Sequence, residues 1–428
     1  MQFGIFHELQ HPRPWSEGGE QQLFLNALDQ AQLADEIGIQ YLWAQEHHFL
    51  EEYSHSSSPE VFLAACSQRT RRIRLGYGVA LMSPNYNHPA RNAERIAALD
   101  LVSQGRVEWG TGESSSRLEL EGFGVPYTEK RAMWAEGLRE AVRMTCSSPY
   151  PGHAGKYFNM PVRNIVPKVV QRPHPPLWLA CSSRETLKLA ARLGMGALTF
   201  SFMDHREAAF WVEEYYDVFR RACVPIGRAV NPNVAMLSGF MLDRDGDQAR
   251  RRGERGLKFF AYGLTHYFRT GVHEPGFTNL WDKFLTEDDF PMAGLGGVGS
   301  PEEVGQVFSA LEEAGVDQLI LLQQAAGYRH DDICASLRLF GDSLLPGFIA
   351  RHAAREARKQ AELAPYIAQA MERADPFEPG VRTALEAYPL MLERAARCDE
   401  GGATRRSIGA DALWQLHVGG ALDNAGER

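Results

Sequence analysis

A glutamate and two consecutive histidines, Glu46-His47-His48, follow a short apolar run at residues 40–44. An imidazole titrates near neutral pH, so a histidine at a strand end can exchange a proton with an oxygen atom of a reacting molecule. Alternation along the strand directs one histidine inward and its neighbour away. The residue types leave two interpretations open, a pair of structural histidines and an acid–base group.

A second candidate is an anion site formed by Arg131 and the pair Ser182-Ser183. The two serines follow an apolar run and open a helical pattern, where free backbone N–H groups and the helix dipole favour a phosphate. An arginine would add two parallel hydrogen bonds. The alternative is a helix-capping serine and a solvated arginine.

Residues 7–11 read HELQH, the zinc-protease pattern HExxH. That chemistry needs both histidines on one helix, one turn apart. Here a strand-like run precedes the motif, and Pro12 and Pro14 follow it, so no long helix can carry it. We therefore expect no metal site.

Residues 294–299 read GLGGVG, the dinucleotide pattern GxGxxG. A dinucleotide loop has to follow a buried strand, whereas the preceding residues 286–293 are acidic and contain Pro291. The residues that follow fit a helix start instead, with Ser300 as the cap, Pro301 in the first turn and Glu303 closing a capping box.

The elements that would position these groups alternate between short apolar runs and longer amphipathic ones. Eight strands, each followed by a helical pattern, within about 345 residues predict a parallel (β/α)8 TIM barrel. A doubly wound open sheet is the alternative. In a barrel, the active-site groups lie at the carboxyl ends of the strands. The predicted strands are residues 2–6, 40–44, 73–81, 106–110, 177–181, 197–201, 233–242 and 317–323.

Two segments exceed a minimal barrel, which we assign to residues 1–346. An insertion before the eighth strand, residues 270–298, is rich in glycine and aromatic residues, and loops of that length are typically lids or binding loops. A C-terminal extension of unknown role, residues 347–428, contains helical patterns at 349–374 and 382–397.

Composition excludes several classes of protein. The 428 residues are 44% hydrophobic and 23% charged, which is ordinary for a globular protein and excludes general disorder. The net charge of −9 argues against a nucleic-acid binder. There is no long apolar run that would cross a membrane and no secretory signal pattern. Six widely spaced cysteines fit reduced thiols, and we expect a cytoplasmic protein.

An ordered set of stretches resembles the bacterial luciferase-like, flavin-dependent monooxygenases. The resemblance runs from Met1 to about Gly347. Each stretch alone is weakly specific, whereas the ordered set is strong support for the family. The stretches are FGIFHE, LWAQEHHF, RIRLGYGVALMSPNYNHPARNAERIAALDLVSQGRVEWGTG, KRAMWAEGL, PPLWLACSS, GSPEEV, GVDQLILL and SLRLFGDSLLP.

The resemblance implies a TIM barrel that commonly forms homodimers and binds reduced FMN supplied by a separate flavin reductase. It implies that O2 adds at the flavin C4a atom and that the resulting C4a-peroxyflavin hydroxylates a small organic substrate or inserts oxygen in a Baeyer–Villiger-type reaction. An F420-dependent oxidoreductase on the same barrel and a non-catalytic flavin-binding subunit are the alternatives.

The same resemblance assigns roles to individual residues. His47 aligns with the catalytic histidine, and Arg131 and Ser182 align with phosphate contacts, to which we add Ser183 at the helix start. Gly78-Val79 lies where the family often has a non-prolyl cis peptide under the flavin. The chain departs from the family at three positions. Gly112 replaces a reactive cysteine, Glu113 a phosphate-binding arginine and Cys181 an acidic residue, so fewer cations are left for the phosphate.

Shielding a reactive oxygenated flavin from water requires a lid, and the insertion 270–298 is the candidate. It contains the aromatic residues Phe277, Trp281 and Phe284. An apolar or aromatic substrate is predicted from the apolar residues expected at the barrel mouth, which are Phe6, Trp43, Tyr77, Trp109, Phe200 and Phe202.

Overall fold

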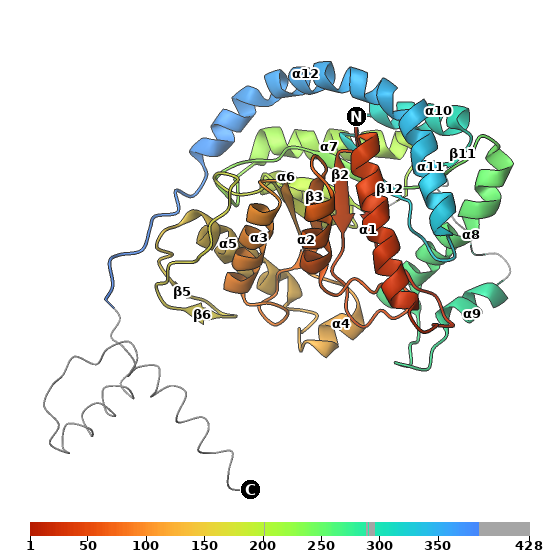
Figure 1. The fold of residues 1–428 in the computed structure, drawn as a ribbon. Coiled ribbons are helices and arrows are strands. Elements are labelled where there is room, and N and C mark those ends of the chain that lie inside the picture. The colour runs from red at the N-terminus through yellow and green to blue at the C-terminus, as the bar shows by residue number, and fades with distance from the viewer. Residues whose placement is uncertain (201, 288–289, 291–295, 385–428) are drawn as a thin grey trace, which may run out of the picture. The chain divides into compact units, whose positions relative to one another are not determined.

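The computed structural model describes residues 1–200, 202–287, 290 and 296–384. Every element below belongs to the compact unit Met1–Gly380. Its centre is a closed barrel of eight parallel strands, as the alternating pattern predicts (Figure 1). In barrel order the strands are β1 (Gln2–His7), β2 (Tyr41–Ala44), β3 (Arg74–Leu81), β4 (Val107–Gly112), β7 (Leu177–Cys181), β8 (Gly196–Thr199), β9 (Val234–Gly239) and β12 (Gln318–Leu322).

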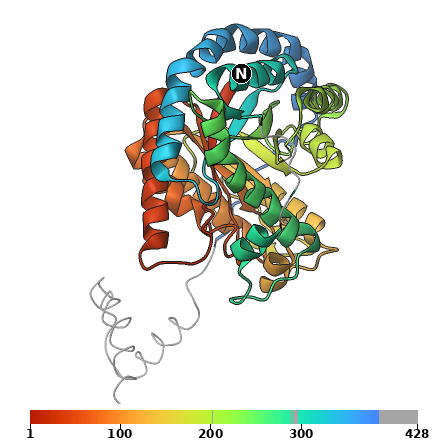
Figure 2. The ribbon, with the colours of Figure 1, turned by 90° about the vertical axis from the view of Figure 1, so that its right-hand side faces the viewer.

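Helices connect the strands and form the outer layer, as Figures 1 and 2 show from two sides. A helix follows each barrel strand, as the alternating pattern predicts. A short helix, α4 (Arg117–Gly122), was not predicted. The others are α1 (Gly19–Ile37), α2 (Pro59–Arg69), α3 (Pro89–Val102), α5 (Lys130–Cys146), α6 (Arg184–Arg192), α7 (His205–Ala222), α8 (Gly246–Thr265), α10 (Pro301–Glu313) and α11 (His330–Ser343).

Alternation along each strand divides the core into two layers. Phe3 and Ile5 of β1 pack toward the helices, whereas Phe6 packs inside the barrel. Trp43 fills much of that interior, and glycine is required opposite it, because a Cβ at Gly76 would lie 2.1 Å from Trp43 Cε3. The interior is therefore a packed core, and a ligand has to bind at an end of the barrel.

The insertion between β9 and β12 contains more regular secondary structure than its glycine content predicts. A π-helical turn, η1 (His266–Thr270), continues α8, and α9 (Leu280–Thr286) follows it. A short pair of strands, β10 (Met241–Leu242) and β11 (Val298–Gly299), joins the two ends of the insertion. A two-stranded hairpin of β5 (His153–Ala154) and β6 (Asn159–Met160), also not predicted, lies between α5 and β7.

The first helix of the C-terminal extension, α12 (Leu345–Glu372), crosses the end of the barrel where the strands begin (Figures 1 and 2). The Phe348 ring packs on that of Phe3, with centroids 5.1 Å apart. Lys359 Nζ pairs with Asp317 Oδ1 at 3.1 Å, immediately before β12. The helix thus covers the end opposite to the expected active site.

The second helix predicted for the extension, at 382–397, lies outside the described residues from 385 onward. Within the described residues, no single helix has the length and apolar character needed to cross a membrane, although α11 and α12 together, bent by 56°, meet that test by length and composition.

Candidate active site

His47 lies three residues beyond β2, at the carboxyl end of the barrel strands. Its backbone N–H donates to Ser56 O at 2.9 Å, which holds the loop in place. The side chain is 5% exposed, and its Nδ1 lies 2.9 Å from Glu119 Oε1. A carboxylate at this distance accepts the Nδ1–H, so Nε2 is the nitrogen left for the site, and the Gln45 side-chain amide lies 2.9 Å from it.

Glu119, on α4, holds His47 in this orientation. It also accepts hydrogen bonds from the His48 backbone N–H at 2.9 Å and from the Ser114 hydroxyl. Burial alone raises the pKa of Glu119, but the His47 charge and these hydrogen bonds outweigh it and bring the pKa below its usual value. Glu119 is therefore an ionised, fully engaged carboxylate.

Glu8 brings a second carboxyl group to the other side of His47. It lies one residue beyond β1, and its Oε1 is 3.7 Å from His47 Nε2. Burial raises the pKa of Glu8 to about 7. Burial lowers the pKa of His47, but the charges of Glu119 and Glu8 raise it to about 9. The imidazole is accordingly a buried cation at neutral pH.

The neighbours of His47 have structural partners of their own. Glu46 accepts hydrogen bonds from the Leu81 backbone N–H at 2.8 Å and from the Tyr77 hydroxyl at 3.2 Å. His48 Nε2 lies 3.2 Å from Glu46 Oε1, and the His48 ring packs on that of Phe123. The two histidines have different surroundings, because His48 contacts Glu46 whereas His47 lies between the carboxyl groups of Glu8 and Glu119.

The peptide bond between Gly78 and Val79 is cis, the geometry that the resemblance implies. Gly112 on the neighbouring strand β4 makes room for it, because a Cβ at Gly112 would lie 2.7 Å from Val79 Cγ2. The glycine that replaces the reactive cysteine of the family is thus required by packing against Val79.

The predicted anion site combines an ion pair and a helix start. Arg131, at the beginning of α5, pairs with Glu113 through its Nη2, 2.5 Å from Oε1, and Lys130 Nζ lies 3.7 Å from the same oxygen. Ser182 is exposed between β7 and α6. Ser183 caps α6 in a capping box, so its hydroxyl is already engaged.

Arg131 also lies near the end of β7. Burial raises the pKa of the Cys181 thiol well above its usual value, and the Arg131 charge partly opposes this.

The insertion is fastened across the mouth by two carboxylates of the loop after β2. Glu51 Oε1 accepts the Gly276 backbone N–H at 2.7 Å, and Glu52 accepts those of Leu280 and Trp281. The turn η1 brings the Phe268 ring over His47, with centroids 5.6 Å apart. π-helical turns are frequent at functional sites.

Several predicted substrate or lid residues lie elsewhere than expected. Trp43 is a core side chain whose Nε1 donates to Gln318 at the start of β12. The prediction that Tyr77 and Trp109 lie at the mouth is wrong, because both side chains pack between the strands and the helices. The side chain of Phe277 is directed to solvent, with 86% of its surface exposed.

The other aromatic residues lie near the mouth. Phe200 packs on Phe6, and Phe202 packs on Phe260 of α8. Trp281 of α9 packs on Phe259, so α9 is joined to α8 by aromatic contacts.

The HExxH stretch does not lie on a helix, and the capping box predicted after the GxGxxG stretch is observed. His7 ends β1 and is fully buried against Phe62, and burial lowers its pKa to about 3. No group of three or more potential metal ligands occurs among the described residues. Ser300 and Glu303 form the predicted capping box of α10. The first residues of the GxGxxG pattern lie outside the described part of the chain.

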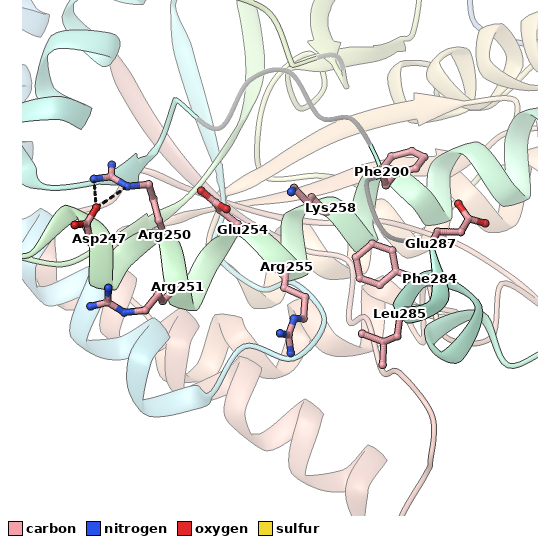
Figure 3. Close-up of a pocket in the computed structure, with 10 residues that line it drawn as sticks. All are labelled: Asp247, Arg250, Arg251, Glu254, Arg255, Lys258, Phe284, Leu285, Glu287 and Phe290. Carbon is pink, nitrogen blue, oxygen red and sulfur yellow. Dashed lines mark hydrogen bonds and ion pairs between the residues drawn. The ribbon is translucent and has the colours of Figure 1, made fainter.

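A separate cavity of about 670 Å³ lies on the outer side of α8 (Figure 3). It is lined by charged residues of both signs from α8 and by Phe284, Leu285 and Phe290, and it contains none of the residues around His47. Figure 3 shows Arg250 turned toward Asp247, with which it pairs at 2.8 Å. This cavity is not the candidate active site.

Sequence reasoning missed Glu119 and the role of Glu8. Glu119 is 72 positions from His47 and lies on a helix too short to have a clear periodic pattern. In the sequence Glu8 stands out only within the zinc motif, although its place directly after a strand, like that of His47, is a usable signal.

The fold and the site define an α/β-barrel protein with acid–base groups at the carboxyl ends of its first two strands. The sequence profile of the luciferase-like monooxygenases matches residues 1–318, and the chain belongs to this family.

Individual relatives agree with this assignment. The chain is 24% identical over 329 residues to the oxygenase component of a flavin-dependent trigonelline monooxygenase of Acinetobacter baylyi, covering 74% of this chain and 88% of that one. It spans about half the length of two curated relatives of Sinorhizobium fredii, at 33% and 35% identity.

Among solved structures, the monooxygenase RslO1 of Streptomyces bottropensis is 28% identical, with a TM-score of 0.67, over 81% of this chain and 100% of that one. An F420-dependent secondary alcohol dehydrogenase, 19% identical over 80% of this chain and 98% of that one, shares the fold with a TM-score of 0.61.

Proposed function

We propose that the protein is the oxygenase component of a two-component flavin-dependent monooxygenase. It would take reduced FMN from a separate flavin reductase and use O2 to oxygenate an apolar or aromatic small molecule, by hydroxylation or Baeyer–Villiger-type insertion. The observation that carries the proposal is His47, a buried imidazolium between the carboxyl groups of Glu8 and Glu119 at the barrel mouth. The naming of a relative as an oxygenase component supports the two-component arrangement.

The residues present fit a flavin phosphate. Lys130, Arg131 and Glu113 together carry a net charge of about +1. The exposed Ser182 precedes the amino terminus of α6. These residues would hold the phosphate group. Gly78 and Val79, with the cis peptide bond between them, would support the ring system.

The reduced flavin, when bound, supplies the two electrons that activate O2. The chain itself supplies a proton and a dry site. His47 donates from Nε2, because Glu119 keeps the Nδ1 proton and stabilises the cation. The insertion is fastened to Glu51 and Glu52, and the Phe268 ring packs on His47. Together they would exclude water from the site.

Anaerobic titration of the protein with reduced FMN and reduced F420, followed by mixing with O2, tests the proposal. We expect reduced FMN to bind and a transient absorbance band to follow the addition of O2. His47→Ala should abolish product while changing flavin affinity little. His48→Ala is the matched control and should keep activity. Binding of F420 alone would favour the dehydrogenase alternative, and equal loss of binding and product in His47→Ala would contradict the role assigned to His47.

A further inference from the structure

Glu8 differs from the other buried glutamates of the barrel mouth. Both carboxylate oxygens of Glu46, Glu52 and Glu119 accept hydrogen bonds from the loops and helices around them. Glu8 is 1% exposed, and its Oε1 has no hydrogen-bond partner among the described residues. Burying an unsatisfied carboxyl oxygen is costly, so a carboxyl group left in this state calls for a functional explanation.

The geometry directs this oxygen toward His47. Strand alternation places Glu8 on the inward side of β1, in line with Phe6 of the barrel interior. Its Oε1 lies 3.7 Å from His47 Nε2, just beyond hydrogen-bond distance, so a shift of under about 1 Å would join the two atoms. Nε2 is the nitrogen that Glu119 leaves available, since Glu119 occupies Nδ1, and besides Glu8 the Gln45 side-chain amide lies 2.9 Å from it.

We propose that Glu8 is a positioning residue that resupplies the proton of His47. The inference rests on the proposed function, in which His47 Nε2 gives its proton to an oxygen atom of the reacting molecule. The O–H bond of protonated Glu8 then breaks as a new N–H bond forms at Nε2. Glu8 is left as a carboxylate and His47 is again a cation, and water restores the Glu8 proton when the site opens.

The surroundings allow Glu8 to exist in both protonation states. Burial favours its neutral form, and the His47 cation, with the hydroxyls of Ser54 and Tyr53, favours the carboxylate. The charge of Glu119 raises the pKa of both Glu8 and His47, and the charge of Glu46, in the same loop as His47, raises the pKa of His47. Glu119 cannot take this role, because its hydrogen bonds hold it in the ionised form.

The test measures the His47 titration by NMR in cofactor-free protein labelled at the histidine rings, with His47→Gln used to assign the signal. Glu8→Gln should lower the His47 pKa by about one unit, since an opposite charge within a few ångströms shifts a pKa by that much or more. Glu60→Gln is the matched control, because Glu60 pairs with Arg95 and the Tyr77 hydroxyl, not with His47. It should leave the His47 titration unchanged.

A second measurement follows product formation against pH over multiple turnovers, because the proton of Glu8 is needed only after His47 has given up its own. The wild type should lose rate as pH rises through about 7, the value at which Glu8 gives up its proton. Glu8→Gln should lack this inflection, and Glu8→Asp should restore it. An unchanged His47 titration in Glu8→Gln would overturn the proposal, as would an inflection that persists. Because the NMR titration needs no flavin, failure of the wild type to bind reduced FMN would count only against the proposed function.

Discussion

Replacing Glu119 by glutamine should remove the pH dependence that His47 gives to stability. The His47 pKa lies at about 9 in the folded protein, against an ordinary value of 6.5. At about 1.4 kcal/mol per unit, this difference corresponds to about 3 kcal/mol of stabilisation by the charged imidazole. Because the folded-state pKa is the higher one, the contribution is complete below pH 6.5 and is lost as pH rises through 9.

In Glu119→Gln the largest source of this shift is gone, and burial then favours the neutral ring. The stability difference between wild type and variant should therefore shrink by about 3 kcal/mol between pH 6.5 and pH 9.5. Urea unfolding at pH 6.5, 8 and 9.5 measures it. Glu8 titrates in the same range in both proteins, so most of its contribution cancels in the difference.

Glu60→Gln is the control, and its effect on stability should be the same at all three pH values. A difference between wild type and Glu119→Gln that stays constant to within about 0.5 kcal/mol would refute the reasoning, because the ion pair would then contribute nothing beyond packing.

Three further predictions concern the lid, the phosphate region and the extension. Glu52→Ala removes one of the two carboxylates that fasten the insertion, so a larger share of O2 should appear as H2O2 rather than product, measured by peroxide assay. Glu113→Gln frees Arg131 from its ion pair and should tighten reduced FMN binding severalfold while leaving riboflavin binding unchanged, measured by anaerobic titration. Asp317→Asn weakens the anchor of Lys359 and should speed proteolysis of α12 at unchanged flavin affinity, measured by limited digestion.

The barrel could be predicted because its signal is local and repeated. Each strand is a short apolar run next to an amphipathic helix, and caps such as Ser300 are built within four residues of chain. The position of His47 followed from the end of such a strand.

The rest of the site depends on contacts that sequence spacing does not encode. The bond between Glu119 and His47 spans 72 positions, and Glu52 reaches the insertion across more than 220. The sequence also does not show which face of the barrel wall the Tyr77 side chain occupies. A shift of one residue along a strand exchanges its inner and outer faces, and Tyr77 lies on the outer one.

The seam of the barrel sets the order in which it can be completed. Gln2 of β1 pairs with Gln318 of β12, so the first strand made has to wait for the last before both of its edges are covered. During synthesis β1 therefore keeps an open edge next to apolar residues, which is the kind of surface that pairs with other chains. Folding yield should depend on how long that edge stays open, and any change that delays β12 exposes the nascent protein to aggregation.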